Sequence, residues 1–324
     1  SGNVLQDFNG TVYLTLYDKP QNVTTLGNDG GSQPTPFRTQ NAVLFKGKAT
    51  AQKGLFSFYF KLPKDINYQY GMGKLSLYAE DGVTDGNGYY DSVTIGGLGS
   101  NGVNDGEGPA IKAFLNDESF VNGSITANNP VLIVKLADSS GINTGGTSID
   151  HDIVATLDGD TRNYYVLNNF YESELDSYQR GSIRFQLPPL SPGPHTLTIK
   201  AWDVMNNSAE YKLDFTIVES TEMVIDHVLN YPNPFTTQTQ FWFEHNQPQT
   251  DLGVHVEIYT VSGKLIKTIS RTINTSGNRS NEVVWDGRDQ YGAKVGRGVY
   301  IYRLQVTNGS GKRADKWERL VLLN

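Results

Sequence analysis

The sequence contains NYPNPF at residues 230–235, IYTVSGKLI at 258–266, VWDGRDQYG at 284–292 and GVYIYRL at 298–304. In the first stretch, Pro232 and Pro234 fix their φ angles, lack N–H donors and push the residue before each of them to extended geometry. In the second, Ser262-Gly263 separates two apolar runs, which is typical of a β-hairpin. The last third of the chain is therefore predicted to form a small antiparallel β-sandwich.

The composition limits the fold and the classes of function. The chain has 324 residues, enough for two or three domains, and its 34 glycines and 18 tyrosines favour all-β modules with many turns. There is no cysteine, which excludes disulfides, thiolate metal ligands and a cysteine nucleophile. The net charge of −7 disfavours binding to nucleic acid, which requires dense lysine and arginine. No apolar run is long enough for a transmembrane helix.

Residues 1–107 are predicted to form a first β domain. Alternating apolar positions mark half-buried strands over residues 12–17 and 75–79, and the three phenylalanines of residues 56–60 predict another strand, which Pro63 ends. Residues 108–219 are predicted to form a second domain. Its strands recur about every ten residues between turn signals such as Asp158-Gly159, as in an immunoglobulin-like sandwich.

Residues 220–324 complete the predicted architecture. We expect three consecutive antiparallel β-sandwich-like domains, of which the last two are immunoglobulin-like. The chain begins with Ser1-Gly2 and no basic segment followed by an apolar core, so we expect any export signal to lie upstream.

Residues 80–107 are the part of the first domain with potential for metal chemistry. Carboxylates and amides among many glycines suit Ca²⁺, which takes six to eight oxygen ligands, although the spacing is not that of an EF-hand. The alternative is a solvated loop without a metal. The candidate calcium ligands are Asp81, Asp85, Asn87, Asp91 and Asp105, with Glu107 nearby. No other cofactor is indicated.

The histidines do not indicate catalysis. None of the five forms an HExxH pattern or a close pair, and His151-Asp152 lacks a nucleophile motif such as GxSxG. We expect a structural role for His151 and no enzymatic activity in this chain.

The four stretches at the end of the chain resemble, in order, the C-terminal sorting domain of the type IX secretion system of Bacteroidetes. Earlier motifs are similar to the region that follows the peptidase domain in the gingipain-like sortase of that system. They are FKG at 45–47, LPKDI at 62–66, DSSGIN at 138–143, HDI at 151–153, LDG at 157–159 and WDVMNNS at 202–208.

The resemblance implies a non-catalytic support and surface-targeting region of a secreted cysteine peptidase. The full-length parent would cleave cargo sorting domains and attach cargo to surface lipopolysaccharide. The implied partners are an upstream peptidase domain and an outer-membrane β-barrel shuttle, and the implied location is the extracellular face of the outer membrane. An alternative is a binding or adhesion module of another surface protein that uses the same export route.

A strand over residues 317–323 is a candidate for docking a partner at a sheet edge. Trp317, Leu320 and Val321 are its candidate contact residues. Alternatively, this strand only completes the sandwich.

Overall fold

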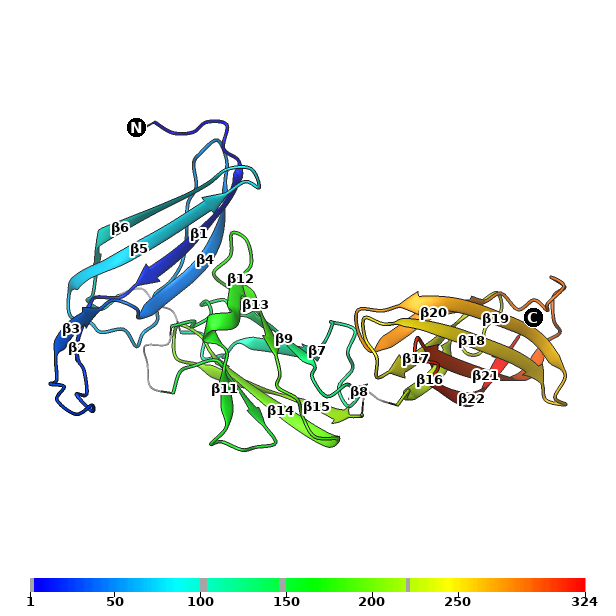
Figure 1. Cartoon of the computed structure of the whole chain (residues 1–324). Helices are drawn as coiled ribbons and strands as arrows, with labels where there is room; N and C mark the ends of the chain where they lie inside the picture. Colours follow the sequence, from blue (N-terminus) through cyan, green and yellow to red (C-terminus); the bar gives the residue numbers. More distant parts are fainter. Residues whose placement is uncertain (1–2, 100–103, 146–149, 220–221, 324) are drawn as a thin grey trace. The chain divides into compact units, whose positions relative to one another are not determined.

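The structure, a computed structural model, describes residues 3–99, 104–145, 150–219 and 222–323 (Figure 1). Its regular elements in these ranges are β-strands and one 3-10 turn, η1 (Asn168–Phe170). The predicted all-β class is confirmed. With three residues, η1 is too short to cross a bilayer, and the ranges above contain no helix that could do so.

The first sheet is four-stranded and antiparallel, in the order β4-β1-β5-β6. The alternation predicted for residues 12–17 is confirmed, because every second side chain of β1 from Val12 to Leu16 is buried. Beside this sheet, β2 (Gln21–Thr24) and β3 (Pro36–Thr39) form a separate two-stranded ribbon. The sheet consists of β1 (Gly10–Tyr17), β4 (Val43–Ala51), β5 (Gly71–Glu80) and β6 (Asp85–Ile95).

The strand predicted over residues 56–60 is wrong, because this segment joins no sheet. Its side chains nevertheless reach the core: Phe58 and Phe60 pack against the buried cluster, and the Phe60 ring stacks on Phe45 with centroids 4.3 Å apart. Phe56 is exposed. The alternation therefore predicted the inward side of Phe58 and Phe60 but not the exposure of Phe56. Side-chain packing, and not a ladder of hydrogen bonds, fixes this segment.

The middle of the chain forms two sheets with the orders β11-β10-β14-β15-β8 and β12-β13-β9-β7. The pairing of β8 with β15 is parallel. The strands are β7 (Ala110–Leu115), β8 (Ile125–Thr126), β9 (Val131–Ala137), β10 (Val154–Leu157), β11 (Tyr164–Val166), β12 (Tyr171–Ser173), β13 (Arg180–Gln186), β14 (Gly193–Trp202) and β15 (Ser208–Ile217).

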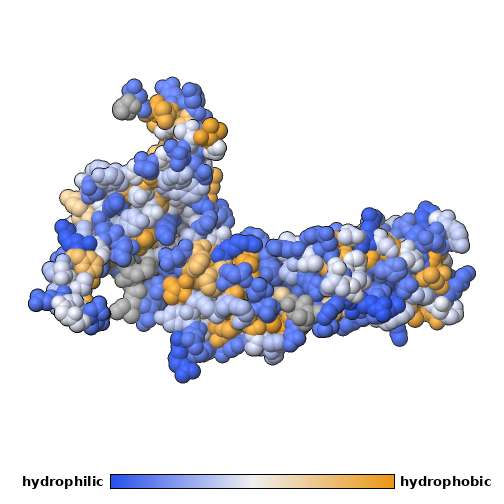
Figure 2. Space-filling view, in the orientation of Figure 1, coloured by the Kyte–Doolittle hydropathy of each residue, from blue (hydrophilic) through white to orange (hydrophobic). Residues whose placement is uncertain are grey.

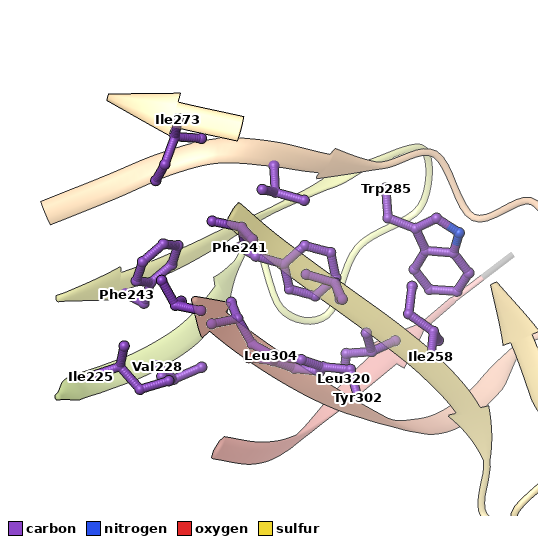
Figure 3. Packing of buried hydrophobic residues seen from close by; sticks show 14 of the residues in the cluster. Ile225, Val228, Phe241, Phe243, Ile258, Ile273, Trp285, Tyr302, Leu304 and Leu320 are labelled. Carbon is purple, nitrogen blue, oxygen red and sulfur yellow. The ribbon is translucent and has the colours of Figure 1, made fainter. Parts of the chain in front are cut away.

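The end of the chain forms a sandwich of sheets β16-β17-β20 and β19-β18-β21-β22. Its core contains Trp285, Phe241 and Tyr302, with the last two rings edge to face at 4.8 Å between centroids (Figure 3). The strands are β16 (Ile225–Tyr231), β17 (Thr239–His245), β18 (Asp251–Thr260), β19 (Leu265–Asn274), β20 (Arg279–Trp285), β21 (Gly298–Asn308) and β22 (Arg313–Leu322).

The chain divides into two compact units, and the division passes through strands of the middle sheets. The domain limits 1–107, 108–219 and 220–324 therefore stay a prediction. One unit comprises Ser1–Ala113, Val134–Arg184 and Leu197–Lys212; the other comprises Phe114–Ile133, Phe185–Thr196 and Leu213–Asn324.

Candidate functional site

The candidate calcium ligands of the first domain are spread along the β5–β6 hairpin and beyond it. Asp81 closes the hairpin turn, because its Oδ1 accepts hydrogen bonds from the N–H groups of Val83 and Thr84 at 2.9 and 2.6 Å. Those two bonds hold the pKa of Asp81 below its usual value. Asp85 Oδ2 accepts from the Tyr78 hydroxyl at 3.3 Å.

Asn87 and Asp91 lie on exposed positions of β6, whereas Asp105 follows the strand and bonds elsewhere. Asp105 accepts from the Ser139 hydroxyl at 2.7 Å, which lowers the pKa of its carboxyl. Within the ranges that the structure describes, no three acidic or histidine side chains gather as ligands for one ion. A calcium site built from these residues stays a prediction.

The candidate docking strand is β22, at one margin of the sheet β19-β18-β21-β22. Leu320 is fully buried and belongs to the core of the sandwich (Figure 3). Trp317 points to the opposite, outer face of the sheet and is 53% exposed. Its ring lies 5.6 Å from the Tyr259 ring and 5.8 Å from the Arg303 guanidinium. Val321 is partly buried, so the three candidates occupy different environments.

The NYPNPF stretch covers the end of the β22 margin. The Asn233 side chain acts as a short piece of backbone: Nδ2 donates to Arg319 O at 3.1 Å, and Oδ1 accepts from the Val321 N–H at 2.9 Å. Phe235 continues this pairing, donating to Val321 O at 3.0 Å and accepting from the Leu323 N–H at 2.9 Å. Strand groups that would otherwise be open to another chain are satisfied here.

The VWDGRDQYG stretch covers part of the opposite margin, formed by β19. The Gln290 N–H donates to Ile266 O at 3.0 Å, and its side-chain Oε1 accepts from the Thr268 N–H at 3.3 Å. Asp289 shapes the turn by accepting from the N–H groups of Tyr291 and Ala293, both at 2.9 Å. Two of the four stretches that carry the resemblance thus close the two margins of one sheet.

His151 pairs with an acidic residue that its sequence context did not indicate. Its Nδ1 lies 2.6 Å from Asp65 Oδ2, and its ring lies 4.2 Å from the Trp202 ring. Among the described residues no serine or threonine hydroxyl bonds to His151. Asp65 was not predicted, because it lies 86 positions before His151 in the sequence.

Three of the earlier motifs, LPKDI, DSSGIN and WDVMNNS, are joined by backbone hydrogen bonds. LPKDI and WDVMNNS are joined by the Lys64 N–H, which donates to Val204 O at 2.9 Å. DSSGIN and WDVMNNS are joined twice, because Val204 N–H donates to Gly141 O at 3.0 Å and Asn143 N–H donates to Trp202 O at 2.9 Å. These backbone bonds connect three segments that are far apart in the sequence.

Comparison with solved structures finds proteins that align along almost the whole chain. Along 99% of its length the chain is 30% identical to a protein described as dimeric latent PorU from Porphyromonas gingivalis, with a TM-score of 0.38. The chain is similar to PorU. It spans 30% of the PorU chain in that structure. No protein-family model and no curated protein matches the chain.

Two adhesion-related structures also align, at much lower identity than PorU. A tetra-tandem repeat from the extending region of a large adhesion protein is 12% identical, with 97% of this chain and 67% of the other covered and a TM-score of 0.24. The BSP domain of a biofilm associated protein is 10% identical, with 99% and 62% covered and a TM-score of 0.25.

Proposed function

We propose that this chain is the non-catalytic support and surface-targeting region of a secreted, gingipain-like cysteine peptidase of the type IX secretion system. Residues 220–324 act as a sorting-type domain that docks on an outer-membrane β-barrel shuttle. The preceding residues support an upstream peptidase domain. In the full-length parent, that peptidase cleaves cargo sorting domains and attaches cargo to lipopolysaccharide at the cell surface.

The proposal is supported by the hydrogen bonds that the motifs make within the fold. The NYPNPF and VWDGRDQYG stretches cover parts of two sheet margins through Asn233 and Gln290, and three of the earlier motifs bond to one another around Val204. Side chains that resemble those of a sortase thus serve packing and hydrogen bonding. The chain has no cysteine to attack a scissile carbonyl.

The test removes residues 230–324 from the full-length parent and follows the protein by surface labelling and by immunoblot of whole cells. We expect normal synthesis but loss of surface retention. Normal retention of the truncated protein would refute the proposal. The purified 324-residue chain should show no peptidase activity. The coding sequence upstream of Ser1 should encode a domain with a Cys/His pair.

The adhesion-module hypothesis makes a different prediction for the same purified chain. A glycan array would then report tight binding to a defined sugar, and deletion of the upstream region of the parent would leave cell adhesion intact. Under our proposal neither result is expected, because docking occurs through protein partners.

A further inference from the structure

The two edge strands of the first sheet, β4 and β6, differ in whether other residues bond to their outer side. The β4 margin is covered: the Lys48 N–H donates to Ser173 Oγ at 3.1 Å, Lys48 O accepts from the Asp176 N–H at 2.9 Å, and the Thr50 N–H donates to Asp176 Oδ1 at 2.7 Å. The β6 margin pairs with β5 alone (Figure 1). Within the described ranges no backbone bond reaches the outer side of residues 85–89.

The hairpin turn fixes which backbone groups of β6 are open. The Asp81 N–H donates to Thr84 O at 3.1 Å. From this turn onward, facing residues of β5 and β6 alternate between pairs that exchange backbone hydrogen bonds and pairs that do not. Asp85, Asn87 and Tyr89 face Glu80, Tyr78 and Ser76 as non-bonded pairs. Their N–H and C=O groups therefore point away from β5. This gives three donors and three acceptors along about 14 Å, enough to pair with a strand of about five residues.

Some of the usual protections of an edge strand are absent from residues 85–90 of β6, which precede the register shift in its pairing with β5. Its 11 residues contain no proline, lysine or arginine. A side chain added at Gly86 or Gly88 would meet no other atom within 4 Å, so the face of the strand that these two positions share is open. On the face visible in Figure 2, hydrophobic residues are interspersed with hydrophilic ones. Backbone pairing is therefore a better basis for binding here than an apolar patch.

Charge and aromatic rings indicate the chemistry of the occupant. Asp85 and Asp91 are exposed, and no lysine or arginine in the described ranges forms an ion pair with either. Tyr78, Tyr89 and Tyr90 are exposed along the same hairpin. The Tyr89 ring already makes a cation–π contact, with Lys74 Nζ 5.5 Å from the ring centroid.

We propose that β6 is a docking site for an extended segment of a partner protein that carries lysine or arginine at alternate positions. The segment adds to the sheet as a strand and bonds to the open groups of Asp85, Asn87 and Tyr89. Its basic side chains lie beside Asp85 and Asp91 and over the tyrosine rings. A second copy of β6 suits the margin less well, because antiparallel pairing centred on Gly88 sets Asp85 opposite Asp91.

The experiment uses the whole chain and a dye-labelled synthetic peptide with alternating lysine and valine, followed by fluorescence anisotropy. Asn87→Pro removes one outward N–H and leaves the β5 ladder intact, whereas Asn87→Ala keeps that N–H. We expect Asn87→Pro to weaken binding by about tenfold or more and Asn87→Ala by less than about twofold. Equal binding by both variants would overturn the proposal, as would failure of the peptide to bind the unmodified chain.

Two further arms separate strand pairing from general attraction to an acidic protein. The double variant Asp85→Asn, Asp91→Asn should weaken binding by about threefold or more and reduce its salt dependence, while folding is checked by circular dichroism. A peptide with N-methyl groups on one edge should not bind, since it cannot donate to β6. Binding of the N-methylated peptide, or a dimer in sedimentation that Asn87→Pro abolishes, would contradict the proposal.

Discussion

Buried His245 should make the stability of the last sandwich depend on pH. Its side chain is fully buried, and burial lowers its pKa from 6.5 to about 4. Nδ1 accepts from the Gln247 N–H at 3.4 Å, and Nε2 lies 2.8 Å from Thr275 Oγ1. The neutral imidazole with its proton on Nε2 fits both contacts. A second proton on Nδ1 would face the Gln247 donor.

The sign and size of the effect follow from the two pKa values. Above pH 6.5 the imidazole is neutral in both states, so its titration does not change the free energy of unfolding. Between pH 6.5 and about 4 the unfolded chain binds the proton and the folded chain does not, so stability falls as pH falls. Below about pH 4 the loss levels off. At about 1.4 kcal/mol for each pH unit, the total loss is about 3 kcal/mol.

The assay is urea unfolding of the whole chain at several pH values between 7 and 4, followed by tryptophan fluorescence. The variant His245→Gln cannot bind this proton, so the difference in pH dependence between the unmodified chain and the variant isolates the histidine from the carboxyl groups. His255→Gln is the matched control, because His255 lies on an exposed part of β18, where Nδ1 bonds to Ser270 Oγ at 2.8 Å. Identical pH dependence of the unmodified chain and His245→Gln would refute the reasoning.

The remaining predictions concern the sheet margins and calcium. Leu320→Ala should lower the free energy of unfolding by about 3 kcal/mol in urea titrations, because it opens a cavity in the core, whereas Trp317→Ala on the outer face should have less than half that effect. Asn233→Ala removes two hydrogen bonds to β22 and should lower the free energy of unfolding by about 1–2 kcal/mol. Tyr231→Ala, at an exposed position of the same stretch, should leave that free energy nearly unchanged. Equal effects of the two variants would contradict the role of Asn233 in covering the β22 margin. Millimolar calcium should leave the melting temperature unchanged, because the first candidate ligand already binds its own turn; a rise that Asp91→Asn removes would instead establish the ion site.

Much of the architecture could be predicted from local patterns. A strand can be predicted from the alternation between Val12 and Leu16, and the structure has it as β1. A hairpin can be predicted from the Ser262-Gly263 turn, and the structure has it as the β18–β19 connection. Residues 56–60 show the limit of this approach. Their alternation predicts the inward side of Phe58 and Phe60, although Phe56 is exposed. A ladder also needs a neighbouring strand with free bonding groups, which is a property of the assembled sheet.

The candidate site was harder to predict for the same reason. His151 was expected to be structural, yet its carboxylate partner is Asp65 rather than the adjacent Asp152. Asn233 gave no sign of its role, because a side-chain amide matches a peptide group only when the β22 margin lies beside it. The sequence suggested Asn87 as a metal ligand through its side-chain oxygen. In the structure Asn87 lies on the edge strand β6, where its backbone N–H and C=O point away from β5.

The partial closure of both margins of the β19-β18-β21-β22 sheet has a consequence for contacts between copies of this sandwich. Crowded sandwiches with open margins can template one another into fibres, since each bare strand invites the next chain. Here the amide of Asn233 and the side chain of Gln290 occupy bonding positions that a neighbouring copy would need. These contacts therefore oppose edge-to-edge pairing at the covered parts of the two margins, and the charged residues of β22 add to that protection.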